Sequence, residues 1–149
     1  MIEVYTDGAC WPNPSTNGGW SFVAYENGVE IKAVNGRTDG LTTNNRMEMT
    51  AMLRALMWLG DRPARLHTDS QLVVYGLNSW CKAWQRRGWQ RKDKKTKELV
   101  PVLNADLWQV MVIARMPQHQ IQWVKGHAGI LGNERADQLA ESACRGVAA

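Results

Sequence analysis

The sequence predicts an α/β fold, a five-stranded mixed sheet with helices on both faces. Two observations lead to this expectation. Residues 2–34 contain three strand patterns joined by a loop and a tight turn, which is typical of an antiparallel meander. From residue 47 onward, helical and strand patterns alternate, which is typical of a sheet covered by helices. The 149 residues suffice for one domain with a buried core.

Alternating side chains predict the first strand at residues 2–9, and two more strands are expected at residues 20–25 and 29–34. Residues 11–19 contain two prolines, two asparagines and two glycines, so we expect a loop there. Glu26-Asn27-Gly28 predicts a hairpin turn between the second and third strands.

An apolar run at residues 47–59 predicts a helix that is buried on most sides and ends at Gly60. Glu48 lies near its start, where one explanation is a capping box with Asn45 as the N-cap. This helix connects the third strand to a fourth at residues 64–69, which we expect to lie beside the first strand and parallel to it.

The rest of the chain predicts four more helices and a fifth strand. The helices are expected at residues 70–77, 80–87, 101–114 and 131–144, and the strand at residues 120–125. Eight of the 18 lysines and arginines fall within residues 80–97, interleaved with Trp80, Trp84 and Trp89. This pattern favours a nucleic-acid-binding surface over a solvated charged face. The net charge of +4 also permits a polyanionic partner.

The three cysteines, Cys10, Cys81 and Cys144, are odd in number and lack metal-site spacing. We therefore expect free thiols in a reducing compartment. No signal peptide or membrane-spanning run is evident, so the sequence predicts a cytoplasmic protein without membrane contact. We expect it to be monomeric.

Aspartates end two of the predicted strands, Asp7 the first and Asp69 the fourth. Adjacent strands lie about 4.8 Å apart, so these carboxylates are expected to be close to each other, although either alone would suit a turn. Together with Glu48 and Asp137 they would form a cluster of four carboxylates, which would repel one another strongly unless a cation neutralised their charge. Oxygen ligands favour Mg²⁺, with Mn²⁺ as a substitute, and two such ions suit an in-line attack of water on phosphorus.

Several ordered motifs give the chain a family resemblance, which extends from Met1 to about Cys144. They are Thr6-Asp7-Gly8, Thr42-Thr43-Asn44-Asn45-Arg46-Met47-Glu48, Thr68-Asp69-Ser70, Trp123-Val124-Lys125-Gly126-His127-Ala128-Gly129 and Asn133-Glu134-Arg135-Ala136-Asp137. In these motifs the sequence resembles the bacterial branch of the type 1 ribonuclease H family. The resemblance implies a ribonuclease H-like fold, with residues 1–149 as one domain and residues 80–97 as a basic protrusion. It also implies an endonuclease that cleaves the RNA strand of RNA/DNA hybrids, leaving 3′-hydroxyl and 5′-phosphate ends.

The resemblance assigns roles to residues at the matching positions. It implies that Asp7, Glu48, Asp69 and Asp137 are catalytic metal ligands, and that His127 assists proton transfer or product release. The expected substrate contacts are Asn13, Asn44, Asn45 and Gln71 in the minor groove, Thr43 and Asn104 at a DNA phosphate, and Trp80, Trp84, Arg86 and Arg87 on the protrusion. For the asparagines, turn and cap roles are the alternative.

Three departures from the family pattern bear on the substrate contacts and leave the carboxylates untouched. Leu41 stands where many bacterial members have an arginine, and Arg37 is one candidate replacement. The loop at residues 10–19 is poorer in glycine, and the connection after Trp89 is longer than usual. His67 and His119 match no family site and are interpreted as structural or surface residues. The alternatives are another enzyme of this fold, such as an integrase or junction resolvase, and a hybrid-binding module without activity.

Overall fold

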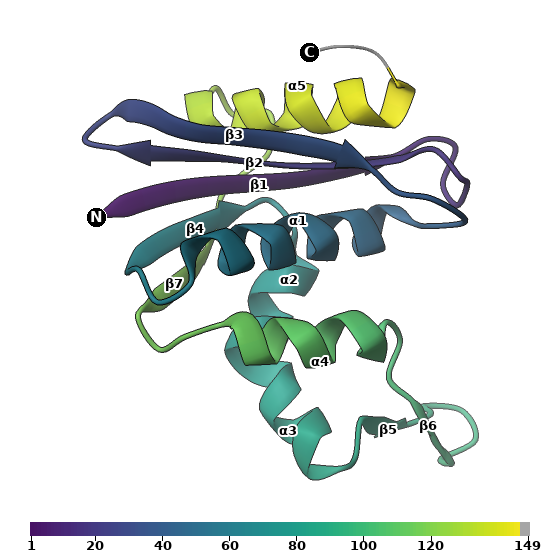
Figure 1. Ribbon diagram of the computed structural model, residues 1–149. Helices are drawn as coiled ribbons and strands as arrows, with labels where there is room; N and C mark the ends of the chain where they lie inside the picture. Colours follow the sequence, from purple (N-terminus) through teal and green to yellow (C-terminus); the bar gives the residue numbers. More distant parts are fainter. Residues whose placement is uncertain (147–149) are drawn as a thin grey trace.

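The computed structural model describes residues 1–146, so positions 147–149 of the predicted domain lie outside the described residues. Its main sheet has five strands in the order β3-β2-β1-β4-β7. They are β1 (Ile2–Cys10), β2 (Gly18–Glu26), β3 (Val29–Arg37), β4 (Ala64–Thr68) and β7 (His119–Trp123). The first three form an antiparallel meander, whereas β4 pairs parallel to β1 and β7 parallel to β4 (Figure 1). The predicted mixed sheet is confirmed.

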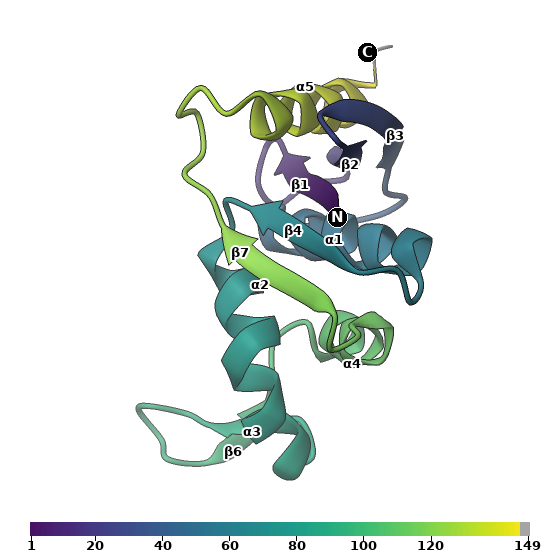
Figure 2. The same ribbon diagram turned by 90° about the vertical axis from the view of Figure 1, so that its left-hand side faces the viewer.

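Helices cover both faces of this sheet, as predicted. Helix α1 (Asn44–Leu59) packs on β1 and β2 from one side, and α5 (Leu131–Arg145) packs across β1, β2 and β3 from the other (Figures 1 and 2). Helix α4 (Ala105–Ala114) packs on α1. The main core therefore lies around α1, whose Met49, Met52 and Leu56 are almost fully buried.

Residues 71–86 form one almost continuous helical rod, so the predicted break between two helices is wrong. The rod consists of α2 (Gln71–Tyr75), the wider turn η1 (Gly76–Trp80) and α3 (Cys81–Arg86). Asn78, near the predicted break, donates to the carbonyl of Ile121 and accepts from Arg115. These tertiary hydrogen bonds satisfy a side chain that would otherwise compete with the helical backbone.

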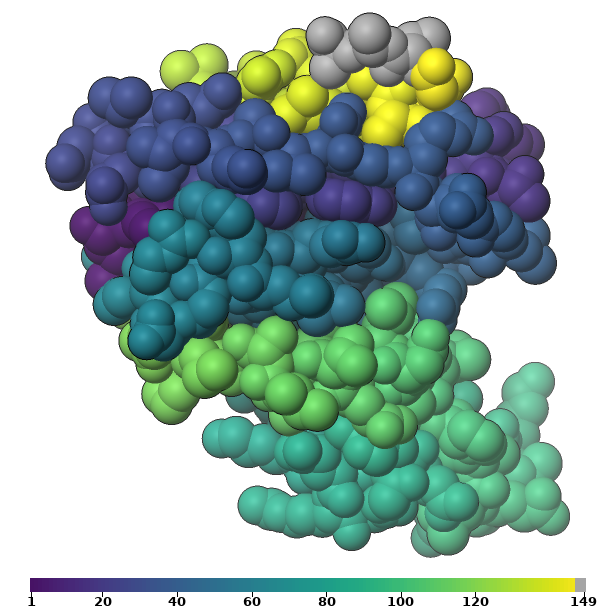
Figure 3. Space-filling model, in the orientation of Figure 1, coloured from purple at the N-terminus to yellow at the C-terminus, as the bar shows by residue number. Residues whose placement is uncertain are grey.

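A short hairpin follows the rod and was not predicted. It pairs β5 (Gln90–Lys92) with β6 (Leu99–Pro101). Helix α4 begins at Ala105, so the predicted start of this helix at residue 101 is wrong. The carboxylate of Asp93 closes the turn by accepting from the backbone N–H groups of Lys95 and Thr96. The space-filling view shows α3 and this hairpin projecting from the body, with a notch between the hairpin and the layers above it (Figure 3).

The remaining histidines and cysteines have structural surroundings. His119 is fully buried, with Nδ1 accepting from the N–H of Met116 and Nε2 bonded to the carbonyl of Arg62. His67 stacks on Tyr5 and contacts the carboxylate of Glu3 at 2.8 Å. All three cysteines are buried and unpaired, as predicted. No helix within residues 1–146 combines the length and the apolar character needed to cross a membrane.

Candidate active site

Three carboxylates meet at one edge of the sheet. Because β1 and β4 run parallel in register, Asp7 near the end of β1 and Asp69 just after β4 lie side by side. Helix α1 passes the same edge and contributes Glu48. Oxygen atoms of these three side chains all lie within 4.8 Å of one another. The predicted proximity of Asp7 and Asp69 is therefore observed.

Glu48 is held by the strands and does not cap its helix. Its Oε1 accepts a 2.6 Å hydrogen bond from the N–H of Gly8, and its Oε2 accepts from the hydroxyl of Thr68. The N-cap of α1 is Thr43, whose Oγ1 accepts from the N–H of Arg46 at 3.2 Å. The capping box between Asn45 and Glu48 is therefore wrong.

The cluster is electrostatically costly without a cation. Burial, followed by the charge of Glu48, raises the pKa of Asp7 far above its usual range. Burial also raises the pKa of Glu48, and burial together with the charge of Asp137 raises that of Asp69. None of the ion pairs found within residues 1–146 involves any of the three. Close, buried oxygen donors without a protein cation are a suitable ligand set for a hard divalent ion.

An open cavity of about 420 Å³ surrounds the cluster. Asp137 reaches it from α5, and His127 from the loop between β7 and α5. All five predicted catalytic residues therefore line one cavity. Its other lining residues are the predicted Asn44, Asn45 and Gln71, together with Gly8, Ser70 and Leu72.

The asparagines at this edge also organise the backbone. The Oδ1 of Asn44 accepts from the N–H of Cys10 at 2.7 Å, and its own N–H donates to the Oδ1 of Asn13 at 3.1 Å. Asn13 does not line the carboxylate cavity. Asn13 and Asn44 therefore join the loop after β1 to the start of α1 through long-range hydrogen bonds, while the side chain of Asn45 is exposed at the cavity.

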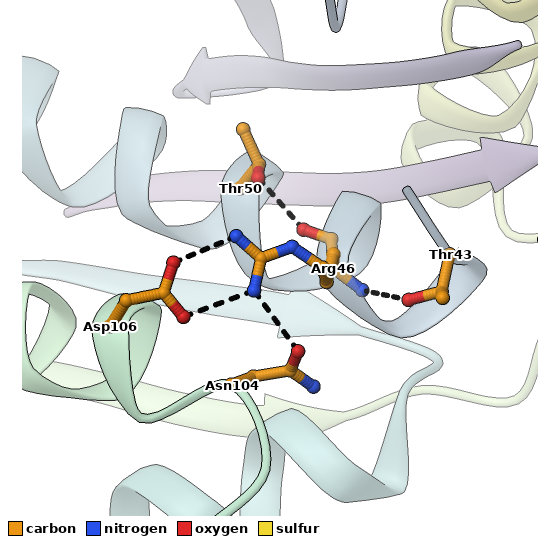
Figure 4. A network of polar contacts seen from close by, with 5 residues as sticks. All are labelled: Thr43, Arg46, Thr50, Asn104 and Asp106. Atoms are coloured by element: carbon orange, nitrogen blue, oxygen red, sulfur yellow. Dashed lines mark hydrogen bonds and ion pairs between the residues drawn. The ribbon is translucent and has the colours of Figure 1, made fainter. Parts of the chain in front are cut away.

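Thr43 and Asn104 are linked through Arg46, a residue that the sequence analysis did not select (Figure 4). The guanidinium of Arg46 donates to the Oδ1 of Asn104 at 3.1 Å and forms a bidentate ion pair with Asp106. The amide nitrogen of Asn104 points away from Arg46 (Figure 4). Thr43 and Asn104, the two predicted phosphate contacts, are thus joined by Arg46 where α1 and α4 begin.

The base of the protrusion forms a second hollow, of about 180 Å³. Trp80, Trp84 and Asn104 line it, and the Trp80 and Trp84 rings are 5.8 Å apart. It shares Asn45 and Leu72 with the carboxylate cavity. Arg86 and Arg87 are exposed and do not line this hollow.

Arg37, the candidate replacement for the arginine missing at Leu41, is bonded to the end of α5. Its guanidinium donates to the carbonyls of Ala143 and Cys144 at the end of α5 and to the side chain of Asn17. Leu41 itself is 75% exposed.

Two supporting groups were missed because only the tertiary structure reveals them. The N–H of Gly8 donates to Oδ1 of Asp7, at 2.9 Å, and to Oε1 of Glu48. The amide nitrogen of the almost fully buried Asn133 has no hydrogen-bond partner among residues 1–146, and this side chain acts to lower the pKa of Asp69 against the larger effect of burial. No spacing in the sequence marks either contact.

Comparison with known proteins agrees with this geometry. The family described as RNase H matches residues 1–145. A protein named ribonuclease H from Hyphomonas neptunium is 50% identical over 94% of this chain and 89% of its own length. Ribonuclease HI of Pseudomonas aeruginosa is 46% identical over 99% of this chain and 94% of its own length.

Solved structures give the same result. RNase H1 from Halobacterium salinarum superposes with a TM-score of 0.69 at 27% identity, covering 98% of both chains. LC11-RNase H1, solved in complex with an RNA/DNA hybrid, gives a TM-score of 0.66 at 26% identity, again over 98% of both chains. The match in sequence along nearly the whole chain, together with the shared fold, means that this protein belongs to the ribonuclease H family.

Proposed function

We propose that this protein is an endonuclease that hydrolyses the RNA strand of RNA/DNA hybrids, leaving 3′-hydroxyl and 5′-phosphate ends. The observation that carries the proposal is the cluster of Asp7, Glu48 and Asp69 at the parallel strand ends, in an open cavity of a ribonuclease H family chain. The hybrid in the structure of LC11-RNase H1 supports the choice of substrate.

The proposed cofactor is Mg²⁺, with Mn²⁺ as a substitute. Asp7 and Glu48 offer buried oxygen donors and Asp69 a half-buried one, and Asp137 adds a fourth carboxylate on the same cavity. When bound, divalent ions would stabilise the negative charge that develops around phosphorus. The carboxylates would hold these ions, and the N–H of Gly8 keeps two of the carboxylates, Asp7 and Glu48, in place.

Substrate selection is assigned to the asparagines and the protrusion. Asn44, Asn45 and Gln71 line the cavity beside the carboxylates, where their amides can bond a ribose 2′-hydroxyl. In the proposal, Asn13 joins these minor-groove contacts from outside the cavity, while Thr43 and Asn104 hold a phosphate of the DNA strand. Trp80, Trp84, Arg86 and Arg87 contact the duplex farther out.

The chain is further proposed to act as a cytoplasmic monomer, with residues 1–149 as one domain and residues 80–97 as its protrusion. The buried, unpaired cysteines support a reducing compartment.

The direct test is incubation of the purified protein with RNA/DNA hybrid, double-stranded RNA and double-stranded DNA, each with Mg²⁺ or with EDTA. Cleavage of the hybrid alone, only with Mg²⁺ and only in the RNA strand, is the expected result. Cleavage of double-stranded DNA would point to an integrase or resolvase, and tight hybrid binding without turnover would point to a binding module.

The role of His127 gives a separate prediction. Its loop is anchored next to the acids, because a Cβ on Gly126 would lie 2.7 Å from Oδ2 of Asp69. His127 itself is exposed in the cavity wall, where it can carry a proton to or from the reacting phosphate. His127→Ala should lower kcat by roughly 10²-fold or less and leave KM for the hybrid nearly unchanged. Calorimetric Mg²⁺ titration is the control, because lost Mg²⁺ affinity would make His127 a ligand.

The protrusion gives another prediction. Replacing the basic residues Arg86, Arg87, Arg91 and Lys92 by alanine should weaken binding to all hybrid sequences alike. Each lost phosphate contact should flatten the slope of log K against log salt by about 0.7 to 0.9. Trp84→Ala should raise KM with little change in this slope, because base stacking is only weakly salt dependent. Titrations of these variants between roughly 50 and 200 mM salt measure both effects. An unchanged KM and an unchanged salt slope would mean that the segment is only a solvated charged face.

A further inference from the structure

The carboxylate cavity opens into hollows on two sides. Toward the protrusion it shares Asn45 and Leu72 with the hollow that contains Trp80 and Trp84. On the other side it shares Gly8, Asn44 and Asp137 with a hollow of about 400 Å³ between the end of β1 and the last turns of α5. The three hollows therefore form one groove with the carboxylates in its middle. Apart from the shared Asn44 and Asp137, none of the residues assigned above lines the hollow beside α5.

Trp11 and Arg145 are the large side chains at that end of the groove. Trp11 is 79% exposed, although tryptophan is usually among the more buried residues. Small side chains, Ala9, Cys10 and Cys144, line the hollow beside it. A hollow with small side chains on its floor and an exposed indole at its rim can receive a flat aromatic group.

The backbone that carries Trp11 is firmly held. The N–H of Trp11 donates to the carbonyl of Asn17 at 3.2 Å. Farther along the same loop, Ser15 and Thr42 exchange two backbone hydrogen bonds, at 3.2 and 2.8 Å. The preceding residue, Cys10, is bonded through its N–H to Asn44. A side chain on such a loop can bind a ligand without the entropic cost of ordering the loop first.

The charges around the hollow favour stacking over phosphate attraction as the main contribution. Arg145 is exposed and only weakly paired with Glu141, at 3.4 Å. Asp137 and Glu141 also line the hollow, so this end of the groove is not strongly basic, unlike the protrusion. Base–aromatic stacking is tolerant of sequence and only weakly dependent on salt.

We propose that the hollow beside α5 is a further substrate subsite, in which Trp11 stacks on a nucleotide of the cleaved strand and Arg145 contacts a phosphate. The cleaved strand is the occupant because Gly8 and Asp137 line both this hollow and the carboxylate cavity. A strand that leaves the carboxylates toward α5 must enter the hollow directly. The inference rests on the proposed function for the identity of the ligand.

The test measures hybrid binding in EDTA by fluorescence anisotropy, so that it does not depend on cleavage. Trp11→Ala should weaken binding about tenfold, as expected for the loss of one stacked base, and Trp11→Phe should retain most of the affinity. Ile113→Ala is the matched control, because Ile113 is 77% exposed on α4 and lines none of the three hollows. Trp11→Ala binding as tightly as the control would overturn the subsite.

Abasic positions placed one at a time along the RNA strand identify the stacked nucleotide. One position should weaken binding to wild type about tenfold and cause no further loss in Trp11→Ala. If only abasic positions in the DNA strand behave this way, the assignment to the cleaved strand is wrong. Arg145→Gln should flatten the salt slope by about 0.7 to 0.9, and an unchanged slope would remove the phosphate contact from the proposal.

The two proposals fail in different ways. A wild-type protein that binds the hybrid and never cleaves it in Mg²⁺ would contradict the proposed endonuclease, while the Trp11 effect would still establish the subsite. A wild-type protein that cleaves normally, with Trp11→Ala showing wild-type affinity, would contradict the subsite alone.

Discussion

Asp7→Asn is expected to abolish hybrid cleavage and, at the same time, to make the metal-free protein more stable at neutral pH. The substitution removes one oxygen ligand from the cluster with Glu48 and Asp69, and it also removes one of three mutually repelling carboxylates. Asp69→Asn should behave in the same way. Hybrid binding in EDTA should be largely retained, because the proposed nucleic-acid contacts lie on other residues.

The stability gain should depend on pH with a defined sign. Burial and the charge of Glu48 raise the pKa of Asp7, so the native state holds a proton that the unfolded chain releases. The free energy of unfolding of wild type therefore falls as the pH rises above the unfolded pKa of about 3.9. A shift of even one pKa unit corresponds to about 1.4 kcal/mol, or about 3–6 °C in Tm for a chain of this size. Thermal unfolding in EDTA should show Asp7→Asn at least this much more stable at pH 7.5 and equal to wild type near pH 4.

Glu3→Gln is the matched control on the same strand. Burial acts to raise the pKa of Glu3, but the hydrogen bonds and charges of His67 and Arg65 together outweigh it and lower the pKa. Its loss should therefore leave cleavage intact and slightly reduce stability at neutral pH. Normal cleavage by Asp7→Asn would refute the catalytic assignment, and a destabilised Asp7→Asn with intact fold would refute the electrostatic account.

The sheet and the carboxylate cluster were predictable because both follow from local patterns and strand geometry. Alternation located β1, and the apolar run located the crossover helix α1. Parallel pairing of β1 with β4 then follows from the crossover, and it brings Asp7 and Asp69 to one edge. A side chain at the end of a buried strand has little freedom in where it can point, so its position follows once the strand order is known.

The contacts of Glu48 could not be predicted, because its partners are distant in sequence. A capping box needs only residues three apart, whereas the observed bonds join Glu48 to Gly8 and Thr68. The same limitation applies to Arg37, which bonds carbonyls of α5 more than 100 residues away. Local propensity describes which bonds a residue can make, and tertiary packing determines which of them it makes.

The protrusion was the least predictable segment. Strands β5 and β6 have three residues each, too few for an alternating pattern to be recognised. Pro101 is favourable at the start of a helix, yet here it ends β6, and α4 begins after Asn104, whose φ is +60°. Charge and aromatic content indicated a basic segment that bears tryptophans, but they did not indicate that its backbone forms a hairpin.

The second large effect is expected from Gly8→Ala. A Cβ at this position would lie 2.3 Å from the backbone N of Glu48 and 2.3 Å from the backbone carbon of Met47. Because both neighbours are backbone atoms of α1, no side chain can rotate away, and β1 must separate from the helix. Overpacking of this kind costs typically 1–3 kcal/mol and occasionally more. The hydrogen bond from Gly8 to Glu48 would also lengthen, which moves one carboxylate away from the other two.

Gly8→Ala should therefore lower kcat by about 10²-fold or more, since a displacement of about 1 Å at a reacting centre is sufficient for such a loss. It should also lower Tm by several degrees and raise the Mg²⁺ concentration needed for half-maximal rate. Gly28→Ala is the control: Gly28 has φ +77° in the β2–β3 turn, and a Cβ there meets no atom within 4 Å. That variant should lose about 1–2 kcal/mol from backbone strain, with kcat and Mg²⁺ requirement unchanged. If both variants lose stability alike and both keep wild-type kcat, the close approach of β1 to α1 does not position Glu48 for the reaction.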